Sequence, residues 1–199
     1  MNFLAHFVLS YPYPDLMAGN FLADFLSKKD HDKLDPNLKA GVEMHQWIDS
    51  FTDSHENISL FNKFFHPVIH HYAPVATDIV MDYFLYKNWL KYIDITYAEF
   101  SKKSYDALLQ HDFLFPDKPR NIAYRMIQGQ WLRQYTSLIG LEEVLLRMNQ
   151  RASFEVDFKL CIPILLQNEQ AMNDLFVDFF NEAQTHAASW ISLRNEEKK

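Results

Sequence analysis

Apolar residues recur along this chain at the spacing of a helix, and this periodicity constrains the fold more than any other feature. In the segment 44–53, Met44, Trp47, Ile48 and Phe51 form one apolar stripe. Similar patterns follow one another along the chain, and no segment shows the alternation of polar and apolar residues expected of a strand. The sequence therefore predicts an all-α fold.

Prolines and short polar stretches divide this pattern into separate helices. We expect helices at 2–9, 14–26, 35–53, 60–72, 75–92, 97–109, 121–128, 130–138, 141–150 and 163–193, with a polar loop at 27–33. The chain has no internal repeat and no shift in composition. We therefore expect a single compact helical domain over residues 1–193, followed by a charged tail, 194–199, that frays.

Composition excludes several classes of function. With only 4 glycines among 199 residues, a glycine-loop nucleotide site is not expected. A net charge of −7 argues against nucleic-acid binding. The single cysteine, Cys161, cannot form an internal disulfide, and its apolar neighbours predict a core thiol. The absence of a basic N-terminal signal region and of a long apolar run predicts a cytoplasmic protein with no membrane association.

Three polar residues of the segment 44–53 stand beside its apolar stripe. His45, Asp49 and Asp53 recur at steps of four, so they form one line on the helix. Carboxylates next to a buried surface need hydrogen-bond partners or a metal ion. A capped, hydrogen-bonded helix with no chemical role is the alternative interpretation.

Other helices carry similar polar residues. Those within apolar patterns are His6, Asp24, His45, Asp49, Asp53 and Asp82. Packing the helices together would let these side chains converge in one pocket. A mixture of imidazole and carboxylate ligands suits Mn²⁺, Fe²⁺ or Mg²⁺, whereas structural zinc favours thiolates. Each residue alone has a structural interpretation, and His6 alone would more often be a satisfied core histidine.

Other histidine clusters are predicted to lie outside this pocket. They are His31-Asp32, His111-Asp112 and the group His66, His70 and His71. The first lies in a charged loop and the second at the end of a helix. Pro67 and bulky apolar neighbours favour a surface or packing role for the third.

Four motifs keep their order and spacing across roughly the first 90 residues. They are Asn2-Phe3-Leu4-Ala5-His6, Gly19-Asn20-Phe21-Leu22-Ala23-Asp24-Phe25, Met44-His45-Gln46-Trp47-Ile48-Asp49 with Thr52-Asp53, and Ala73-Pro74-Val75 leading to Asp78-Ile79-Val80-Met81-Asp82. Together they resemble the acyl carrier protein phosphodiesterase family. A weaker likeness continues at Trp131-Leu132 and Met148-Asn149-Gln150-Arg151.

This resemblance implies an all-α fold divergently related to the His-Asp (HD-domain) metal phosphohydrolases. It also implies hydrolysis of the phosphodiester between 4′-phosphopantetheine and a serine of holo-acyl carrier protein, which gives the apo-protein. The implied cofactor is a divalent ion, most often Mn²⁺, with Mg²⁺ or Fe²⁺ as alternatives. Where the superfamily has adjacent His-Asp, this chain has His45-x-x-x-Asp49.

Roles for individual residues follow from that activity. The expected metal ligands are His6, Asp24, His45, Asp49 and Asp82. Asp49 can also orient the attacking water, while Asp53 and Asn20 are expected to hold the ligands in place. A divalent ion would neutralise the phosphate oxygens and activate water near neutral pH.

The protein substrate implied by the resemblance is acidic, so an enzyme of net charge −7 needs a local basic patch to meet it. The candidates are Lys28, Lys29, Lys33, Arg120, Arg125, Arg133 and Arg151. Two alternatives remain: a metal phosphohydrolase acting on a small molecule or nucleotide, and a non-catalytic helical binding protein. The sequence makes no prediction of the oligomeric state.

Overall fold

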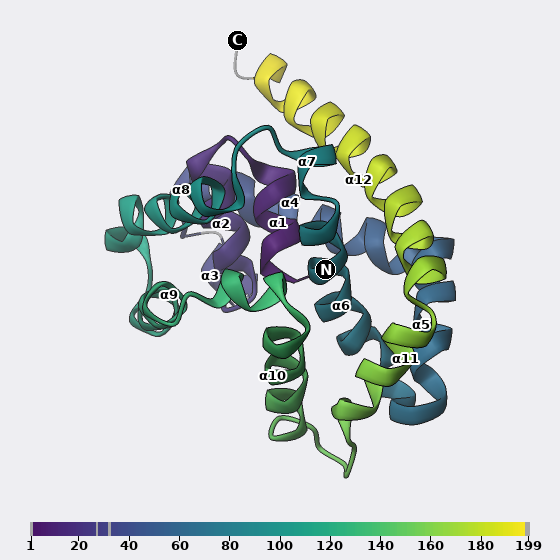
Figure 1. Cartoon of the computed structure of the whole chain (residues 1–199). Coiled ribbons are helices and arrows are strands. Elements are labelled where there is room, and N and C mark those ends of the chain that lie inside the picture. Colours follow the sequence, from purple (N-terminus) through teal and green to yellow (C-terminus); the bar gives the residue numbers. More distant parts are fainter. Residues whose placement is uncertain (1, 27, 32, 198–199) are drawn as a thin grey trace.

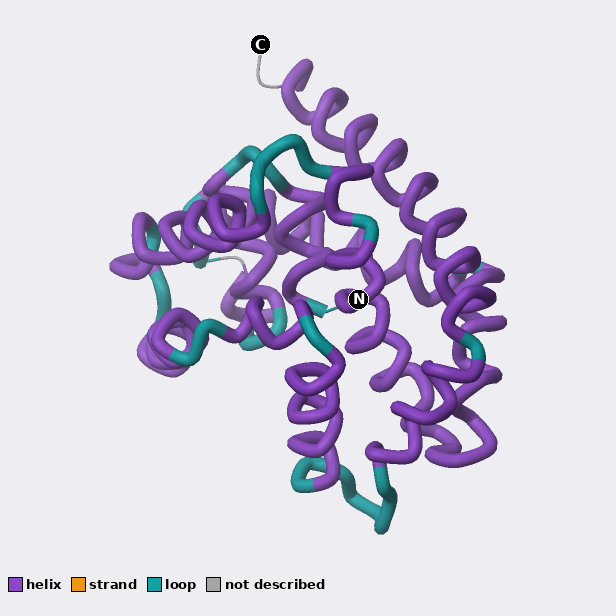
Figure 2. Tube along the Cα trace, viewed as in Figure 1, coloured by secondary structure: helices purple, strands orange, loops and turns teal. Residues whose placement is uncertain are grey.

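A computed structural model describes residues 2–26, 28–31 and 33–197 of the chain. Throughout these ranges the regular structure is helical, and none of them forms a strand (Figure 2). The prediction of an all-α fold is confirmed. None of the helices in the described ranges is long and apolar enough to cross a membrane.

The helices follow the chain in an order that the sequence pattern largely predicted. The α-helices are α1 (Phe3–Ser10), α2 (Pro14–Ala23), α3 (Lys28–His31), α4 (Pro36–Ser54), α5 (Glu56–Ile69), α6 (Ala73–Lys87), α7 (Trp89–Tyr92), α8 (Tyr97–Gln110), α9 (Asp117–Gln128), α10 (Leu138–Asn149), α11 (Cys161–Gln167) and α12 (Glu169–Glu197). Short 3₁₀ helices join some of them: η1 (His70–Tyr72), η2 (Asp112–Leu114), η3 (Trp131–Thr136) and η4 (Phe158–Leu160).

Several predicted boundaries were wrong. The segment 130–138 is mostly the 3₁₀ helix η3, because Gln130 turns the chain with a left-handed backbone (φ 47°). The predicted helix 163–193 is interrupted at Asn168, whose side chain caps the end of α11 by donating to the Ile164 carbonyl at 2.9 Å. α12 then continues to Glu197, beyond the predicted end, and residues 28–31 form a short helix inside the predicted loop.

Helix α1 lies in the middle of the molecule, and α12 runs along one edge (Figure 1). Every residue of α1 from Leu4 to Ser10 is buried, because α2, α4, α6 and α12 pack around it. The core is rich in phenylalanine, and Cys161 is a buried thiol in it, as predicted. A polar side chain on α1 is therefore held inside the molecule, where its partners must come from neighbouring helices.

Helices α2 and α4 approach each other backbone to backbone. A Cβ atom at Gly19 would lie 2.1 Å from the Leu38 carbonyl oxygen, and one at Gly41 would lie 2.4 Å from the Leu16 carbonyl oxygen. Only glycine fits at either position, because real Cβ atoms do not come so close to other atoms. This contact brings Asn20, which follows Gly19, towards His45, one turn after Gly41.

Candidate metal centre

Two histidines from different helices lie face to face in the core. His6 comes from α1 and His45 from α4; both are buried, and their rings stack with centroids 4.3 Å apart. Asn20 of α2 joins them, because its Oδ1 lies 2.8 Å from His6 Nδ1 and 2.9 Å from His45 Nδ1. The convergence of these helices that the sequence predicted is therefore found for His6 and His45.

The asparagine sets the tautomer of both rings. Its Nδ2 lies 3.4 Å from the His6 carbonyl oxygen and donates to it, so its oxygen faces the imidazoles. A carbonyl oxygen only accepts hydrogen bonds, and both Nδ1 atoms must therefore carry the protons that they donate to it. In the neutral rings, each Nε2 then has a free lone pair, which is the arrangement that metal-binding histidines use.

Both lone pairs are directed towards Asp49. Its Oδ2 lies 3.0 Å from His45 Nε2, and its Oδ1 lies 3.3 Å from His6 Nε2. His6 Nε2 is buried and has no hydrogen-bond partner among the described residues. Ligand atoms of His6, His45 and Asp49 all lie within 4.8 Å of one another, so this group can hold a metal ion.

Burial and the neighbouring side chains both affect the pKa values in this group. Burial lowers the pKa of His6 to about 4, so the ring is neutral near pH 7. Burial raises the pKa of Asp49, and the contacts with His45 and His6 lower it only when their Nε2 atoms carry protons. A neutral imidazole lone pair facing a carboxylate is repulsive, and a cation between them removes the repulsion. The donor set therefore fits a divalent ion.

Asp24 stands at the edge of the group. It follows the end of α2, its Oδ1 lies 3.6 Å from His45 Nε2, and burial raises its pKa. The side chains of Asp24 and Asp49 are 44% and 45% exposed, so the carboxylate side of the group is open to solvent while the histidine side is closed. A substrate can therefore approach only from the side of these two aspartates.

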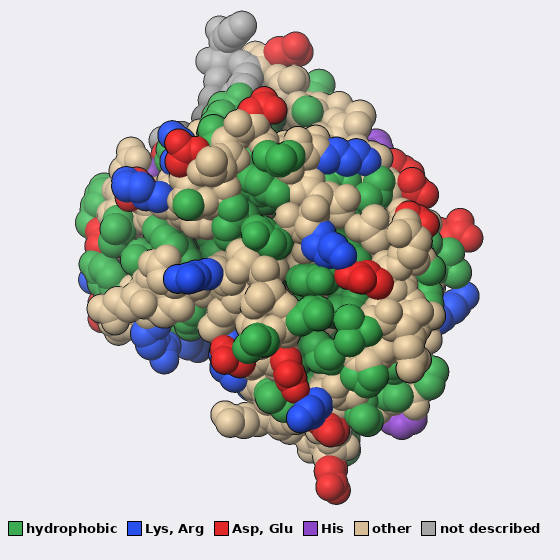
Figure 3. Space-filling model, in the orientation of Figure 1, with side chains coloured by type: hydrophobic (Ala, Val, Ile, Leu, Met, Phe, Trp, Pro, Cys, Tyr) green, Lys and Arg blue, Asp and Glu red, His purple; other side chains and the backbone are tan. Residues whose placement is uncertain are grey.

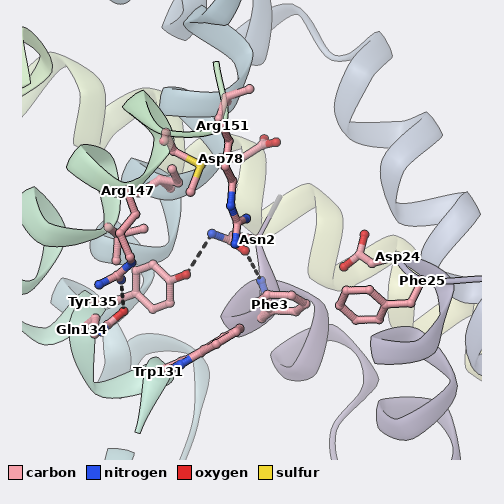
Figure 4. A pocket seen from close by; sticks show the side chains of 14 residues that line it. Asn2, Phe3, Asp24, Phe25, Asp78, Trp131, Gln134, Tyr135, Arg147 and Arg151 are labelled. Carbon is pink, nitrogen blue, oxygen red and sulfur yellow. Dashed lines mark hydrogen bonds between the residues drawn. The ribbon is translucent and has the colours of Figure 1, made fainter. Parts of the chain in front are cut away.

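A cavity of about 490 Å³ begins at Asp24. Figure 4 shows Phe25 and Phe3 beside this residue, and Arg147, Gln134 and Tyr135 on the other side of Phe3. This cavity was not predicted from the sequence. Arg147, in the last turn of α10, and Arg151, just after the end of this helix, both line the cavity.

Asp82, which was predicted to be a metal ligand, has other partners in the structure. It is fully buried on α6, and its two carboxylate oxygens accept the backbone N–H groups of Leu4 and Ala5 at 3.0 and 3.1 Å. These amides are at the start of α1, where N–H groups lack helical partners and the helix dipole favours a negative charge. Asp82 therefore anchors the N-terminus of α1 and is not part of the group around His6. These contacts do not support its predicted role as a metal ligand.

Asp53 and the other histidines lie apart from this group. Asp53 is exposed one turn after Asp49, and its proposed role in orienting the ligands stays a prediction. His111 is bound by Asp15, at 2.7 Å from its Nε2, and by the Ala107 carbonyl, which supports its exclusion. His66 and His70 contact each other edge to face on the surface. The pair His31-Asp32 cannot be compared, because Asp32 lies outside the described residues.

The predicted docking residues have different surroundings. Arg125, Arg133 and Arg151 are exposed, as is Lys33, whereas the side chains of Lys28 and Lys29 lie outside the described part of the chain. Arg120 donates to the carbonyls of Asp112 and Phe115 at 2.9 and 2.7 Å, which indicates a structural role. On the face seen in Figure 3, Lys and Arg side chains are interspersed with acidic and apolar ones.

The fold and this group together define an all-α protein with a candidate metal centre of two histidines and an aspartate beside a cavity. The chain belongs to the acyl carrier protein phosphodiesterase family, whose model matches residues 1–183.

Relatives with that name cover most of the chain. The acyl carrier protein phosphodiesterase of Yersinia enterocolitica is 28% identical over 188 residues, which are 94% of this chain and 97% of the relative. That of Yersinia pestis is 26% identical over 90% of this chain and 94% of its own length. An Escherichia coli relative is 29% identical over 76% of this chain and 79% of its own length. No solved structure was found to match.

Proposed function

We propose that this protein hydrolyses the phosphodiester that joins 4′-phosphopantetheine to a serine of holo-acyl carrier protein. The observation that carries the proposal is the pair of Nε2 lone pairs facing Asp49 at the solvent-open side of a buried group, in a chain of this family. Water adds to phosphorus and the bond from phosphorus to the serine oxygen breaks. The serine regains its hydroxyl, and 4′-phosphopantetheine leaves with the phosphate.

We propose a divalent cation as the cofactor, with Mn²⁺ the best fit and Mg²⁺ or Fe²⁺ as alternatives. His6, His45 and Asp49 would hold it, and Asp24 is close enough to join them. Imidazole and carboxylate donors together match Mn²⁺ or Fe²⁺ better than Mg²⁺, which prefers oxygen ligands. When bound, such an ion supplies charge neutralisation at the phosphate and lowers the pKa of a bound water.

The residues of the chain itself position the metal ligands and limit the access of water. Asn20 holds both imidazoles in one tautomer and one orientation, so their Nε2 atoms need no rearrangement to bind. The stacked rings close the inner side of the site, which keeps bulk water to the side of Asp24 and Asp49. We keep Asp49 as the residue that orients the attacking water, with Asp53 behind it on the same helix.

The acidic carrier protein is the proposed partner, and its docking surface must lie near the open side of the site. Arg125 and Arg133 remain the candidates because both are exposed. Arg151 lines the cavity instead, and Arg120 is engaged by backbone carbonyls.

The deciding experiment is incubation of the purified protein with holo-carrier protein and Mn²⁺. Mass spectrometry should show loss of the phosphopantetheine arm and formation of the apo-protein. His45→Ala and Asp49→Ala should lose this activity while keeping helical circular dichroism near that of the wild type. Holo-carrier protein that stays intact after long incubation with folded, metal-loaded wild type would contradict the proposal. Near-full turnover by either variant would contradict it as well.

A further inference from the structure

The cavity that begins at Asp24 leads away from the candidate metal centre. Asp24 belongs to both places, since its Oδ1 lies 3.6 Å from His45 Nε2 and its side chain lines the cavity. The volume of about 490 Å³ is within the range of about 300–1,000 Å³ that is typical of small-molecule sites. A ligand bound with its phosphate at the metal centre would thus have room for its remaining atoms in this cavity.

The part of the cavity nearest Asp24 is aromatic. The ring of Phe3 stacks on that of Phe25 at 6.4 Å between centroids, and the ring of Trp131 lies 6.4 Å from Phe3 on its other side. These rings come from the start of α1, the end of α2 and η3, and they form one continuous wall (Figure 4). Such a wall favours an apolar segment of a ligand close to the metal centre.

The far part of the cavity carries several hydrogen-bond donors beside the carboxyl group of Asp78. Arg147 donates to the side chain of Gln134, and Asn2 donates to the Tyr135 hydroxyl at 2.8 Å. Arg151 lies exposed at the rim, and within the described ranges no residue engages its guanidinium. Guanidinium and amide N–H groups donate hydrogen bonds, and the carbonyl oxygens of a ligand can accept them. This end therefore favours a segment of ligand that carries carbonyl groups.

The pantetheine arm has these features in the same order. Next to its phosphate it carries a quaternary carbon with methyl groups, and further along it carries uncharged amides before the terminal thiol. We propose that this cavity binds the pantetheine arm, with the methyl groups against Phe3 and Phe25 and the amide carbonyls facing Arg147 and Arg151. This inference rests on the proposed function, because the phosphate must sit at the metal centre.

The alternative use of the two arginines is attraction of acidic side chains on the carrier protein. The cavity favours the arm for two reasons. Arg147 is already oriented by Gln134, and the rings of Phe3 and Phe25 provide no hydrogen bond for a carboxylate. The two uses predict different results with free pantetheine, which has the amides of the arm but neither a phosphate nor a protein surface.

A blocking substitution with a matched control tests the proposal. Met148 and Ile139 are both on α10, but Met148 lines the cavity whereas Ile139 is 75% exposed and does not. Met148→Trp should abolish calorimetric binding of free pantetheine and lower kcat/KM on holo-carrier protein by about tenfold or more, because the lost contacts bind the substrate. Hydrolysis of bis(p-nitrophenyl) phosphate, which lacks the arm, should change little. Ile139→Trp should match the wild type in all three measurements.

Arg151→Met is the second variant, because an exposed position is not needed for folding. It should weaken pantetheine binding as well as raise KM for holo-carrier protein. A raised KM with unchanged pantetheine binding would overturn the proposed contact in favour of carrier-protein docking. Wild type that cleaves holo-carrier protein but binds no pantetheine, or Met148→Trp that keeps full activity, would overturn the cavity assignment. Wild type that binds pantetheine but cleaves no holo-carrier protein would contradict the proposed function alone.

Discussion

The imidazole rings of His6 and His45 stack at 4.3 Å between centroids with 21° between their planes, although 38 residues separate them in the chain. This arrangement presents their two Nε2 atoms on the same side, towards Asp49. Two Nε2 lone pairs facing one carboxylate are a poor arrangement for stability alone, because unsatisfied buried polar atoms cost free energy. The cost is offset when a cation binds.

The first prediction concerns that cation. Adding Mn²⁺ at about one hundred times its dissociation constant should raise the free energy of unfolding by about 2.7 kcal/mol, because the ion binds only the folded site. Thermal denaturation with Mn²⁺ and with chelator measures the change, and activity should follow the metal. His45→Ala is the control and should show no shift. The same shift in wild type and variant would place the ion elsewhere.

The second prediction concerns Asn20. Asn20→Leu removes the oxygen that accepts from both Nδ1 atoms, so the rings lose their fixed tautomer and orientation. The affinity for Mn²⁺ should fall by about 10–100-fold, the usual effect of losing such a support. Titration followed by the paramagnetic resonance signal of free Mn²⁺ measures this. Asn20→Asp keeps an acceptor oxygen and should retain more affinity; wild-type affinity in the leucine variant would rule out the role.

The third prediction concerns the contact between α2 and α4. Gly41→Ala adds a Cβ where the Leu16 carbonyl oxygen would be 2.4 Å away, so the helices must separate. We expect a loss of about 1–3 kcal/mol or more in the free energy of unfolding, as for other overpacked sites. Urea denaturation provides the measurement. Ser50→Ala, exposed on the same helix, should be close to neutral. Equal stability of the two variants would contradict the close approach.

The fourth prediction concerns pH and Asp82. Burial raises the pKa of Asp82 to about 7 despite its hydrogen bonds from Leu4 and Ala5, whereas the pKa of an aspartate in the unfolded chain is about 3.9. The folded protein therefore holds this proton more tightly. Its contribution to stability is fully present below about pH 4 and is lost as the pH rises through 7.

Asp82→Asn has no such proton. The difference in the free energy of unfolding between variant and wild type should therefore shift in favour of the variant as the pH rises from 4 to 8. Urea denaturation across this range measures the difference, which removes the contribution of groups that both proteins share. A difference that stays constant with pH would show that the carboxyl has an ordinary pKa.

The fifth prediction separates docking from chemistry. Activity on holo-carrier protein should fall as salt rises, because exposed charges are screened over about 8–10 Å at physiological ionic strength. Arg125→Glu and Arg133→Glu should chiefly raise KM for this substrate. A small phosphodiester is the control and should show neither effect. Equal losses on both substrates would mean that these arginines support the fold or the site.

The parts of the structure that the sequence predicted are those that depend on local spacing. The period of Met44, Ile48 and Phe51 is sufficient to identify a helix with one buried face. The step of four from His45 to Asp49 is likewise a property of one helix, so their proximity followed directly. The presence of His6 in an apolar helix then made it a reasonable third member.

The parts that could not be predicted depend on which helices meet. Asp82 looked like any other acid in an apolar helix, and only the packing of α6 on α1 shows that its oxygens are used by the amides of Leu4 and Ala5. The cavity has the same origin, because Phe3 and Trp131 lie side by side although they are 128 positions apart in the chain. The left-handed turn at Gln130 has no clear sequence signal, since glutamine rarely adopts it.

The close contact of Gly19 with Gly41 has a consequence for how this protein can change over time or in the laboratory. Since backbone meets backbone there, no side chain is available through which the spacing of the two helices could be adjusted in small steps. We therefore expect substitutions elsewhere in the core to change the distance between Asn20 and His45 very little. Variation in metal preference or in substrate must therefore come from the open side of the site. There, Asp24, Asp49 and the cavity can be altered while the contact between α2 and α4 stays constant.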